Sequence, residues 1–218
     1  MLIPNLALLR STIETYLARP DLHEVSDSLI GLAEDRIYYG SSNNSYPSPP
    51  LRLTCLEKIN EIDENLTTLN SPYLDLPKDC LEIRTVGIYG PTISKIELVS
   101  LDQVLSQSGQ TGMPRYGAII GNRLRLAPTP DRAYPILFNY YRRLPTILDG
   151  GSNSLLEQCP GLYLYGALLE AQPFIMQDER LAVWASLYAG LATALMESDH
   201  RNRFGGRPFS SRIEGVAP

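Results

Sequence analysis

The sequence predicts an α+β fold: a helical bundle from N- and C-terminal helices, an inserted antiparallel β domain and a flexible C-terminal arm. Apolar residues recur every three or four positions near both ends of the chain, as in amphipathic helices. In the middle they alternate with polar residues, as in half-buried strands. We expect N-terminal bundle helices in residues 1–40, an inserted β domain with a short helix in 41–150, C-terminal bundle helices in 151–204 and an extended C-terminal arm in 205–218.

Two helices are predicted at the N-terminal end. The first lies in NLALLRSTIETYLA, where apolar residues share one face until Pro20 ends the pattern. The second lies in SDSLIGLAEDRIYYG, with Ser26 as a candidate N-cap and Gly40 as the terminator. Its predicted apolar face comprises Leu29, Leu32, Ala33 and Ile37. Residues 40–50 then predict a loop, and residues 51–70 fit either a helix or extended chain.

The β domain is predicted from Asp75 onward, where the period changes to two. CLEIRTVGIYG and TISKIELVS predict a hairpin around Gly90-Pro91, followed by a short helix that begins with a capping box at Ser100 and Gln103. RYGAII and RLRLAP predict a second hairpin around the turn Gly121-Asn122. In RLRLAP the arginines face one side and the leucines the other. The last strand, YPILFNYYRR, is expected at an edge of the sheet because it contains Pro135.

Helices return after residue 150. NSLLEQCPGLYLYGALLEAQPF has Asn153 or Ser154 as a cap and Pro160 in a first turn, but two glycines reduce its helix propensity, so packing must stabilise it. The next helix, DERLAVWASLYAGLATALMESDHRNR, carries one apolar seam that we expect in the core. The seam consists of Leu181, Trp184, Tyr188, Leu191 and Leu195. The remaining FGGRPFSSRIEGVAP shows no periodicity, which is typical of a flexible arm.

Length and composition limit the class of protein. The chain has 218 residues, 44% of them hydrophobic, enough for one domain or for one helical body with a β insertion. Its first residues mix charges into apolar positions and do not resemble a signal peptide. No run reaches the roughly 18 apolar residues of a membrane-spanning helix. Three cysteines, Cys55, Cys80 and Cys159, without CxxC spacing predict buried thiols in a reducing compartment.

Charge is distributed unevenly along the chain. The net charge of −5 argues against a nucleic-acid grip along the whole sequence. Residues 21–66 contain nine acids and three bases, whereas residues 115–143 contain six arginines and one acid, and residues 201–218 contain four arginines and one acid. Opposite patches on one chain suit head-to-tail self-association. Charge alone still favours the alternative, ordinary solvated faces.

The sequence predicts no catalytic centre and no metal site, so we expect a protein that is not an enzyme and needs no cofactor. The two histidines, His23 and His200, stand far apart, and no phosphate-binding loop, nucleophile elbow or zinc motif occurs. The adjacent acids Glu34-Asp35 and Asp178-Glu179 point to different sides of their helices. We interpret both pairs as solvated faces.

Several segments, taken in order, carry a resemblance to a known family. They are SLIGLAEDRIYYG, LDLPKDCLEIRTV, the string GN-x-L-R-L-x-P-x-P within MPRYGAIIGNRLRLAPTPDRAYPILFNYYRRLPTI, and the string L-L-x-x-x-P-x-L-Y-L-Y-G-A-L-x-E-A that precedes the last helix. Over residues 26–204 the chain resembles the adaptor proteins of tailed bacteriophages, the head-to-tail connectors that sit below the portal.

The resemblance implies a structural virion protein at the head-tail interface, present in the host cytoplasm during assembly. It implies a homo-oligomeric ring, expected to be a dodecamer, that joins the capsid to the tail and continues the DNA channel. The implied partners are the portal protein, a downstream tail or nozzle protein, further copies of the chain, and packaged DNA that passes without sequence-specific binding. No membrane is implied. A nucleic-acid-binding module that uses the arginine-rich hairpin is the alternative.

Two groups of site residues follow from the resemblance and the charge pattern. The C-terminal extension is similar to an arm that docks on the portal, here Phe204, Gly205, Gly206, Arg207, Pro208, Phe209, Arg212 and Ile213. The second group would pair charges between subunits or line the lumen. It comprises Arg123, Arg125, Arg132, Arg142, Arg143, Glu34 and Asp35.

Overall fold

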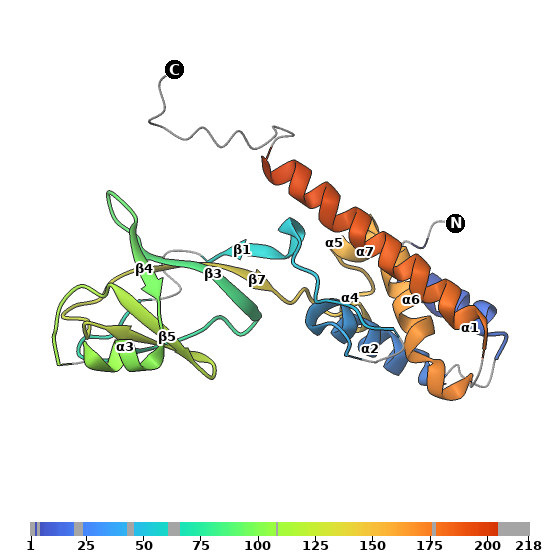
Figure 1. The fold of residues 1–218 in the computed structure, drawn as a ribbon, viewed down its shortest axis with the longest axis horizontal. Coiled ribbons are helices and arrows are strands. Elements are labelled where there is room, and N and C mark those ends of the chain that lie inside the picture. Colours follow the sequence, from blue (N-terminus) through green and yellow to red (C-terminus); the bar gives the residue numbers. More distant parts are fainter. Residues whose placement is uncertain are drawn as a thin grey trace, which may run out of the picture. The chain divides into compact units, whose positions relative to one another are not determined.

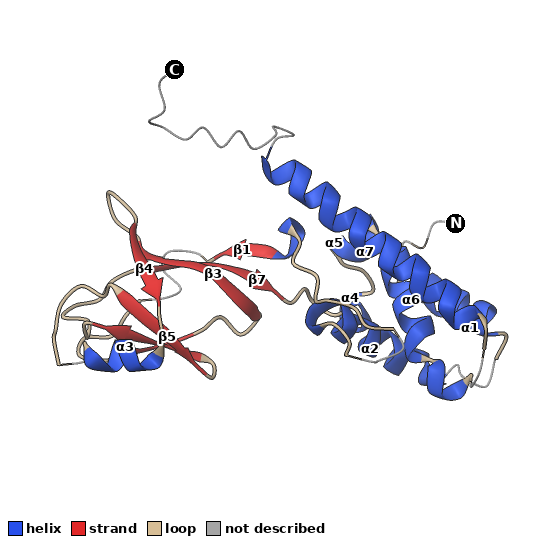
Figure 2. Ribbon diagram, viewed as in Figure 1, coloured by secondary structure: helices blue, strands red, loops and turns tan. Residues whose placement is uncertain are grey.

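The computed structural model describes residues 3, 5–19, 24–42, 46–60, 66–107, 109–175 and 178–204. The chain forms two compact units, which Figure 1 shows by sequence colour. The helical unit combines Met1–Thr54 with Thr146–Pro218, and the β unit is the intervening Cys55–Pro145. All the named strands belong to the β unit, as the colouring of Figure 2 makes plain. The α+β class is therefore confirmed.

The helical unit is organised around one central helix. This helix, α6 (Pro160–Glu170), contacts α1 (Leu6–Leu17), α2 (Ser26–Tyr39), α5 (Ser154–Gln158) and α7 (Arg180–Phe204). A short helix, α4 (Ile147–Gly150), and a 3-10 turn, Gln172–Phe174, complete the unit.

Glycine allows α6 to approach its neighbours closely. A Cβ on Gly166 would lie 3.1 Å from the Ala33 Cβ of α2, and one on Gly161 would lie 2.6 Å from a Leu191 methyl of α7. Any larger side chain would push the helices apart. The glycines that weaken the intrinsic helix propensity of this segment are thus offset by tight packing.

Local signals account for the ends of the first two helices, but the predicted N-cap and one predicted buried residue of α2 were wrong. The Asn5 side chain accepts a hydrogen bond from the Leu8 backbone N–H at 3.0 Å and begins α1. Gly40 ends α2 with a φ of 76°, in the left-handed range that favours glycine. Ser26 is the first helical residue of α2 and not its N-cap, a position that Val25 occupies. Leu32 is 47% exposed, so its assignment to the buried face was wrong.

The seam predicted for α7 is confirmed in its first half. Leu181, Trp184 and Tyr188 are buried, whereas Leu191 and Leu195 are only half-buried and Ala192 takes the next buried position. The sequence predicted no membrane-spanning run, yet α7 is long and apolar enough to cross a membrane by length and composition alone, because its most apolar 18-residue window has a mean hydropathy of 1.2. The buried Trp184 and Tyr188 show that one side of α7 belongs to the core of the unit.

The β unit is a curled seven-stranded sheet. Its strands are β1 (Glu57–Ile59), β2 (Tyr73–Asp75), β3 (Cys80–Ile88), β4 (Ser94–Leu98), β5 (Tyr116–Ile120), β6 (Arg123–Ala127) and β7 (Ile136–Arg142). They are arranged in the order β1-β7-β3-β4-β5-β6-β2. Side chains from non-adjacent strands share one core, including Val86 of β3, Ile96 of β4, Leu124 of β6 and Phe138 of β7. The curl therefore lets a single sheet enclose its own core.

Both predicted hairpins and the short helix are present in the β unit. Ile88 pairs with Ser94 across the first hairpin and Ile120 with Arg123 across the second. The helix α3 (Leu101–Ser106) begins with the predicted capping box, in which the Ser100 N–H donates to Gln103 Oε1 at 3.2 Å. Residues 51–70, which the sequence left open, contain a 3-10 turn at Thr54–Leu56 and β1 in the part that the structure describes.

Two expectations about the sheet were wrong. The sheet is not wholly antiparallel, because β4 and β5 pair in parallel after the crossover that contains α3. The strand after Pro135 is not at an edge, because β7 lies between β1 and β3. Pro135 directly precedes the first residue of β7, where its missing N–H removes no hydrogen bond from the β3 and β7 ladder. The edges are the three-residue strands β1 and β2.

Candidate functional site

The arginines of β6 lie beside the short edge strand β2. The register pairs Arg123 with Asp75 and Arg125 with Tyr73. Arg123 Nε donates to Asp75 Oδ1 at 2.8 Å, with both side chains more than half exposed. Arg125 Nη1 donates to the Tyr73 hydroxyl at 2.8 Å, and its guanidinium lies 5.3 Å from the centre of that ring. Because Leu124 and Leu126 are buried, both arginines lie on the opposite face of β6, as predicted. Arg123 is exposed there, whereas Arg125 is half-buried and its buried Nε has no hydrogen-bond partner among the described residues.

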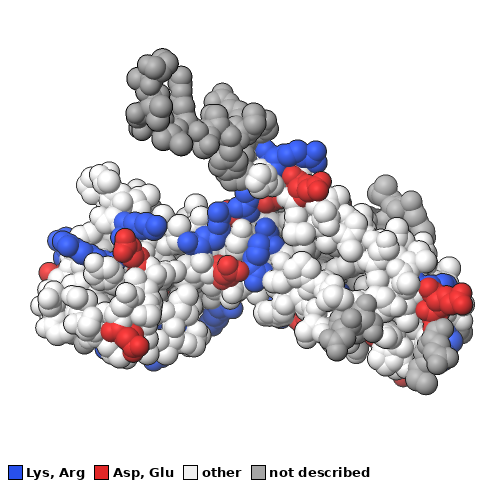
Figure 3. Space-filling view, in the orientation of Figure 1, with Lys and Arg blue, Asp and Glu red and all other residues white. Residues whose placement is uncertain are grey.

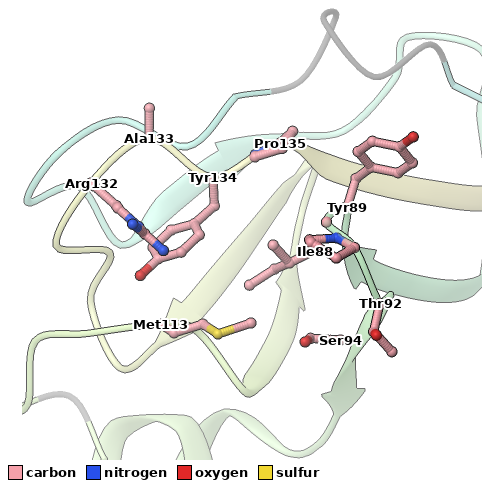
Figure 4. A pocket seen from close by; sticks show the side chains of 11 residues that line it. Ile88, Tyr89, Thr92, Ser94, Met113, Arg132, Ala133, Tyr134 and Pro135 are labelled. Atoms are coloured by element: carbon pink, nitrogen blue, oxygen red, sulfur yellow. The ribbon is translucent and has the colours of Figure 1, made fainter.

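Arg132 lies in a different part of the β unit. Its guanidinium stacks over the Tyr134 ring at 4.9 Å, and the Tyr134 hydroxyl donates to Asp131 at 2.6 Å. The hydrogen bond to Asp131 raises the pKa of Tyr134, so this hydroxyl stays protonated at neutral pH. Figure 4 shows these two side chains together at a shallow hollow of about 350 Å³ whose wall also includes Met113.

Arg142 and Arg143 follow one another at the end of β7. Arg142 is half-buried, and its buried Nε has no hydrogen-bond partner among the described residues. Arg143 is exposed, and its backbone N–H donates to the Asp79 carbonyl at 2.7 Å. The five predicted arginines thus come from three places in the β unit.

Glu34 is buried, which contradicts its assignment to a solvated face. The residue is 1% exposed and accepts a hydrogen bond from the Ile147 backbone N–H at 3.0 Å. Its carboxylate therefore serves the first turn of α4 within the same chain. Asp35 points the other way and is exposed, as predicted. Ile30 and Ile37, four residues before and three after Glu34, share its helix face, and that spacing could have identified the burial.

Sequence reasoning missed a buried ion pair centred on Arg36. Its side chain is 3% exposed, and Nε donates to Glu170 Oε1 at 2.7 Å. Nη1 donates to the Tyr46 carbonyl at 3.0 Å, and the guanidinium lies 5.9 Å from the centre of the Tyr188 ring. The group joins α2, the loop after it, α6 and α7. A single arginine within an apolar face was the only sequence signal for it.

A second polar group holds Thr54 to α7. Asp199 accepts hydrogen bonds from the Thr54 N–H at 2.6 Å and from Arg203 Nε at 2.7 Å. Partial burial raises the pKa of Asp199, but hydrogen bonds from Thr54 and Arg203 outweigh it and lower the pKa overall. The C-terminal half of α7 is thereby tied to the segment at which the chain leaves the helical unit.

No candidate metal or thiol centre emerges from the residues that the structure describes. Within the described ranges, no group of three or more His, Cys, Asp or Glu side chains could hold a metal ion. Cys159 is buried, while Cys55 and Cys80 are only half-buried, so the prediction of buried thiols holds for one of three. Burial, with a smaller contribution from Asp79, raises the pKa of Cys80 to about 11, so this thiol stays protonated at neutral pH. His23 lies outside the described residues.

The predicted docking arm falls almost entirely outside the described residues. Phe204 is the last residue of α7, and Gly205, Gly206, Arg207, Pro208, Phe209, Arg212 and Ile213 lie beyond the described part of the chain. The assignment of this arm stays a prediction.

Comparison with known proteins gives one family. No match is found among curated protein sequences. A family described as SU10 adaptor protein matches residues 4–212, which include most of both segments of the helical unit and the whole β unit. The resemblance to bacteriophage adaptors inferred from the sequence motifs is thereby confirmed. The chain belongs to the SU10 adaptor protein family of bacteriophage structural proteins.

Proposed function

We propose that this protein forms a ring below the portal, joins the capsid to the tail and continues the channel through which DNA leaves the head. The observation that carries the proposal is the family match, because it extends over nearly the whole chain and not over one motif. The proposed partners are the portal, a downstream tail or nozzle protein and further copies of the chain in a dodecamer. The proposed location is the virion, after assembly in the host cytoplasm.

Electron microscopy of the purified protein mixed with its portal tests this function directly. We expect a ring of density on the tail side of the portal, with a central opening wide enough for duplex DNA. The protein without the portal is the control. Absence of added density at saturating protein would contradict the proposal.

We propose that residues 205–218 dock on the portal. The segment carries two large apolar residues, Phe209 and Ile213, and two arginines, Arg207 and Arg212, among mostly small and polar residues. A tail of this kind can gain binding energy by burying its apolar residues on a partner. Truncation after Phe204 should leave the circular dichroism spectrum intact and abolish portal binding in a pull-down. Wild-type binding by the truncated chain would count against the docking arm.

The exposed arginines of the β unit offer charge for contacts between subunits. Arg123 supports this role best, because its partner Asp75 is itself exposed and a surface ion pair of this kind exchanges readily with other partners. Asp35 can take part from the helical unit, whereas buried Glu34 cannot. Arg123→Glu should impair ring formation, measured by sedimentation with the portal, while Lys95→Glu serves as a charge-matched control. Equal assembly of both variants would argue against pairing at Arg123.

DNA binding by the same hairpin is the second candidate function. Its support is that Arg123 and Arg125, at alternate positions of β6, share the face opposite the buried leucines. A net charge of −5 favours passage of DNA over tight binding. Retention of the free protein on a DNA column at physiological salt, lost on replacing both arginines, would favour this alternative.

A further inference from the structure

The outer face of α7 carries no charge. Residues 181–196 include sixteen consecutive uncharged side chains, of which Leu181, Trp184, Tyr188 and Ala192 are buried. On the opposite side Val183 and Leu187 are 58% and 43% exposed. We define the α7 outer face as the exposed residues Ala182, Val183, Ser186, Leu187, Ala189, Gly190, Thr193 and Ala194. Figure 3 shows uncharged surface over α7, with charged groups near its two ends.

Such a face is unusual for a helix on a protein surface. Surface helices normally carry charged residues opposite their buried stripe, and a helix that is apolar all round is covered on all sides. Here only 22% of the most apolar part of α7 is buried. Contiguous exposed apolar surface marks a site of interaction.

A membrane is a poor fit as the covering surface. The inner side of α7 holds Trp184 and Tyr188 in the core of the helical unit. Each end carries an ion pair, Asp178 with Arg180 at 2.5 Å and Asp199 with Arg203 at 2.7 Å. Insertion into a bilayer would have to remove the helix from its core and desolvate these charges.

A second uncharged face lies on α1 of the same unit. Leu8, Ser11 and Thr15, at helical spacing, are exposed, and we call them the α1 outer face. The Ser11 hydroxyl donates to the Leu8 carbonyl at 3.0 Å, and the Thr15 hydroxyl donates to the Ser11 carbonyl at 2.8 Å. Because both hydroxyl protons are already used within the helix, covering this face leaves no side-chain donor unsatisfied.

We propose that the α7 outer face of one copy packs against the α1 outer face of a second copy. The inference rests on the ring assembly proposed above and identifies a surface for it. One heterologous contact covers both uncharged faces at once, and repetition of that contact closes a ring. A portal or tail partner seated on α7 would leave the α1 outer face uncovered.

Geometry fits this pairing. The uncharged stretch of α7 is about 24 Å long and α1 is about 18 Å long, so the shorter helix can lie along the longer. Small residues recur every four positions on α7, at Ala182, Ser186, Gly190 and Ala194. A Cβ on Gly190 would meet nothing within 4 Å, so the surface there is open to a second helix. Small side chains allow two helix backbones to approach closely.

One such contact is expected to be weak by itself. Two helices of this length bury less than the roughly 800 Å² per partner of a standard interface. Each copy in a ring makes the contact twice, and a portal template would hold neighbours together. We therefore expect a monomer in dilute solution and association on the portal.

Gly190→Leu separates folding from assembly. The substitution fills open space on the monomer and replaces a helical glycine by a better helix former, so its melting temperature should equal or exceed that of the wild type. It should nevertheless block close helix packing and reduce ring formation on the portal at least tenfold in sedimentation. Gly150→Leu is the matched control, since Gly150 is exposed, helical and equally open. Rings formed equally well by Gly190→Leu would overturn the proposal.

Cysteine cross-linking identifies the occupant. A mixture of one variant with Leu187→Cys and another with Ser11→Cys, both in a Cys55→Ser background, should cross-link between copies on the portal. Cys159 is buried and Cys80 is largely protonated, which keeps background reaction low. Cross-links formed by the Leu187→Cys variant without the Ser11→Cys variant would overturn the pairing. Binding of the wild type to phosphatidylglycerol vesicles would also overturn it, if Gly190→Leu abolishes that binding. Absence of wild-type rings would overturn the ring function too, whereas Gly190→Leu rings would overturn only this inference.

Discussion

The two units differ in the polar groups that they bury, because only the helical unit buries carboxyl and guanidinium side chains among the described residues. In the helical unit Arg36 is paired to Glu170 and Glu34 accepts a hydrogen bond from the Ile147 N–H, while parts of the outer surface carry no charge. In the described part of the β unit, the buried polar residues are the neutral Asn60 and Thr67. The charges of that unit lie on its outer or half-exposed positions. Sheet hydrogen bonds fix strand positions residue by residue, whereas helices can slide and rotate against each other. We expect the Arg36–Glu170 pair to limit that freedom.

The largest effect we predict lies in the apolar core of the helical unit. Trp184→Ala should lower the free energy of unfolding by about 3–5 kcal/mol, because the side chain is 4% exposed and leaves a cavity. Circular dichroism in urea measures this, since the variant lacks the single tryptophan. Phe138→Ala in the β unit is the matched variant. A midpoint that hardly moves would show that α7 contributes little to the core.

The buried ion pair tests the comparison most directly. Arg36→Met keeps the volume but removes the charge, and should cost about 3 kcal/mol, near the lower end for a broken buried pair because Glu170 is 23% exposed and can rehydrate. Trp184 fluorescence in urea reports on the same unit. Arg84→Met breaks the pair with Glu57 in the β unit and should cost under about 1 kcal/mol, because the Arg84 side chain is 39% exposed and the Arg36 side chain 3%. Equal losses of unfolding free energy in the two variants would show that the ion pair of the helical unit is no more important for stability than that of the β unit.

Asn60 tests whether neutral groups suffice in the β unit. Its side-chain amide donates to the Ile136 carbonyl at 3.0 Å and its oxygen accepts from the Phe138 N–H, so it extends the β7 ladder beyond β1. Asn60→Ala should cost about 1–3 kcal/mol, because two buried backbone groups lose their partners. Thermal unfolding by circular dichroism checks this against Asn122→Ala, an exposed turn residue. Indistinguishable variants would mean that water replaces the amide.

The smallest effect concerns pH and Asp199. Since its folded-state pKa is lowered, its contribution to stability is present above the unfolded-state pKa of about 3.9 and is lost as pH falls through the lower folded-state pKa. Asp199→Asn should therefore reduce the melting temperature at pH 7 and flatten its decline in acid. Melting curves from pH 2 to 7 for both proteins measure the difference. Parallel curves would show that Asp199 does not contribute to the acid sensitivity.

Local sequence patterns were sufficient to predict the helical and strand periods and the turns. Some features depend only on neighbouring residues, so they could be predicted from the sequence. They are the apolar spacing in α1 and α7, the hairpins at Gly90-Pro91 and Gly121-Asn122, and the capping box at Ser100. The shared face of Arg123 and Arg125, opposite Leu124 and Leu126, followed from the same alternation. The family was also within reach, because its motifs are strings of adjacent residues.

Which elements contact one another depends on packing between segments that are distant in the sequence. The parallel pairing of β4 with β5 and the interior position of β7 depend on strands distant in sequence. The sequence placed Glu34 on a solvated face, whereas in the structure it accepts a hydrogen bond from the Ile147 N–H of α4. Arg36 pairs with Glu170, which lies 134 positions away in the sequence. The outer face of α7 is likewise defined by packing, because Trp184 and Tyr188 are the residues that lie on the core side. Burial depends on what packs against a helix, and a helical period alone does not show which apolar side remains open.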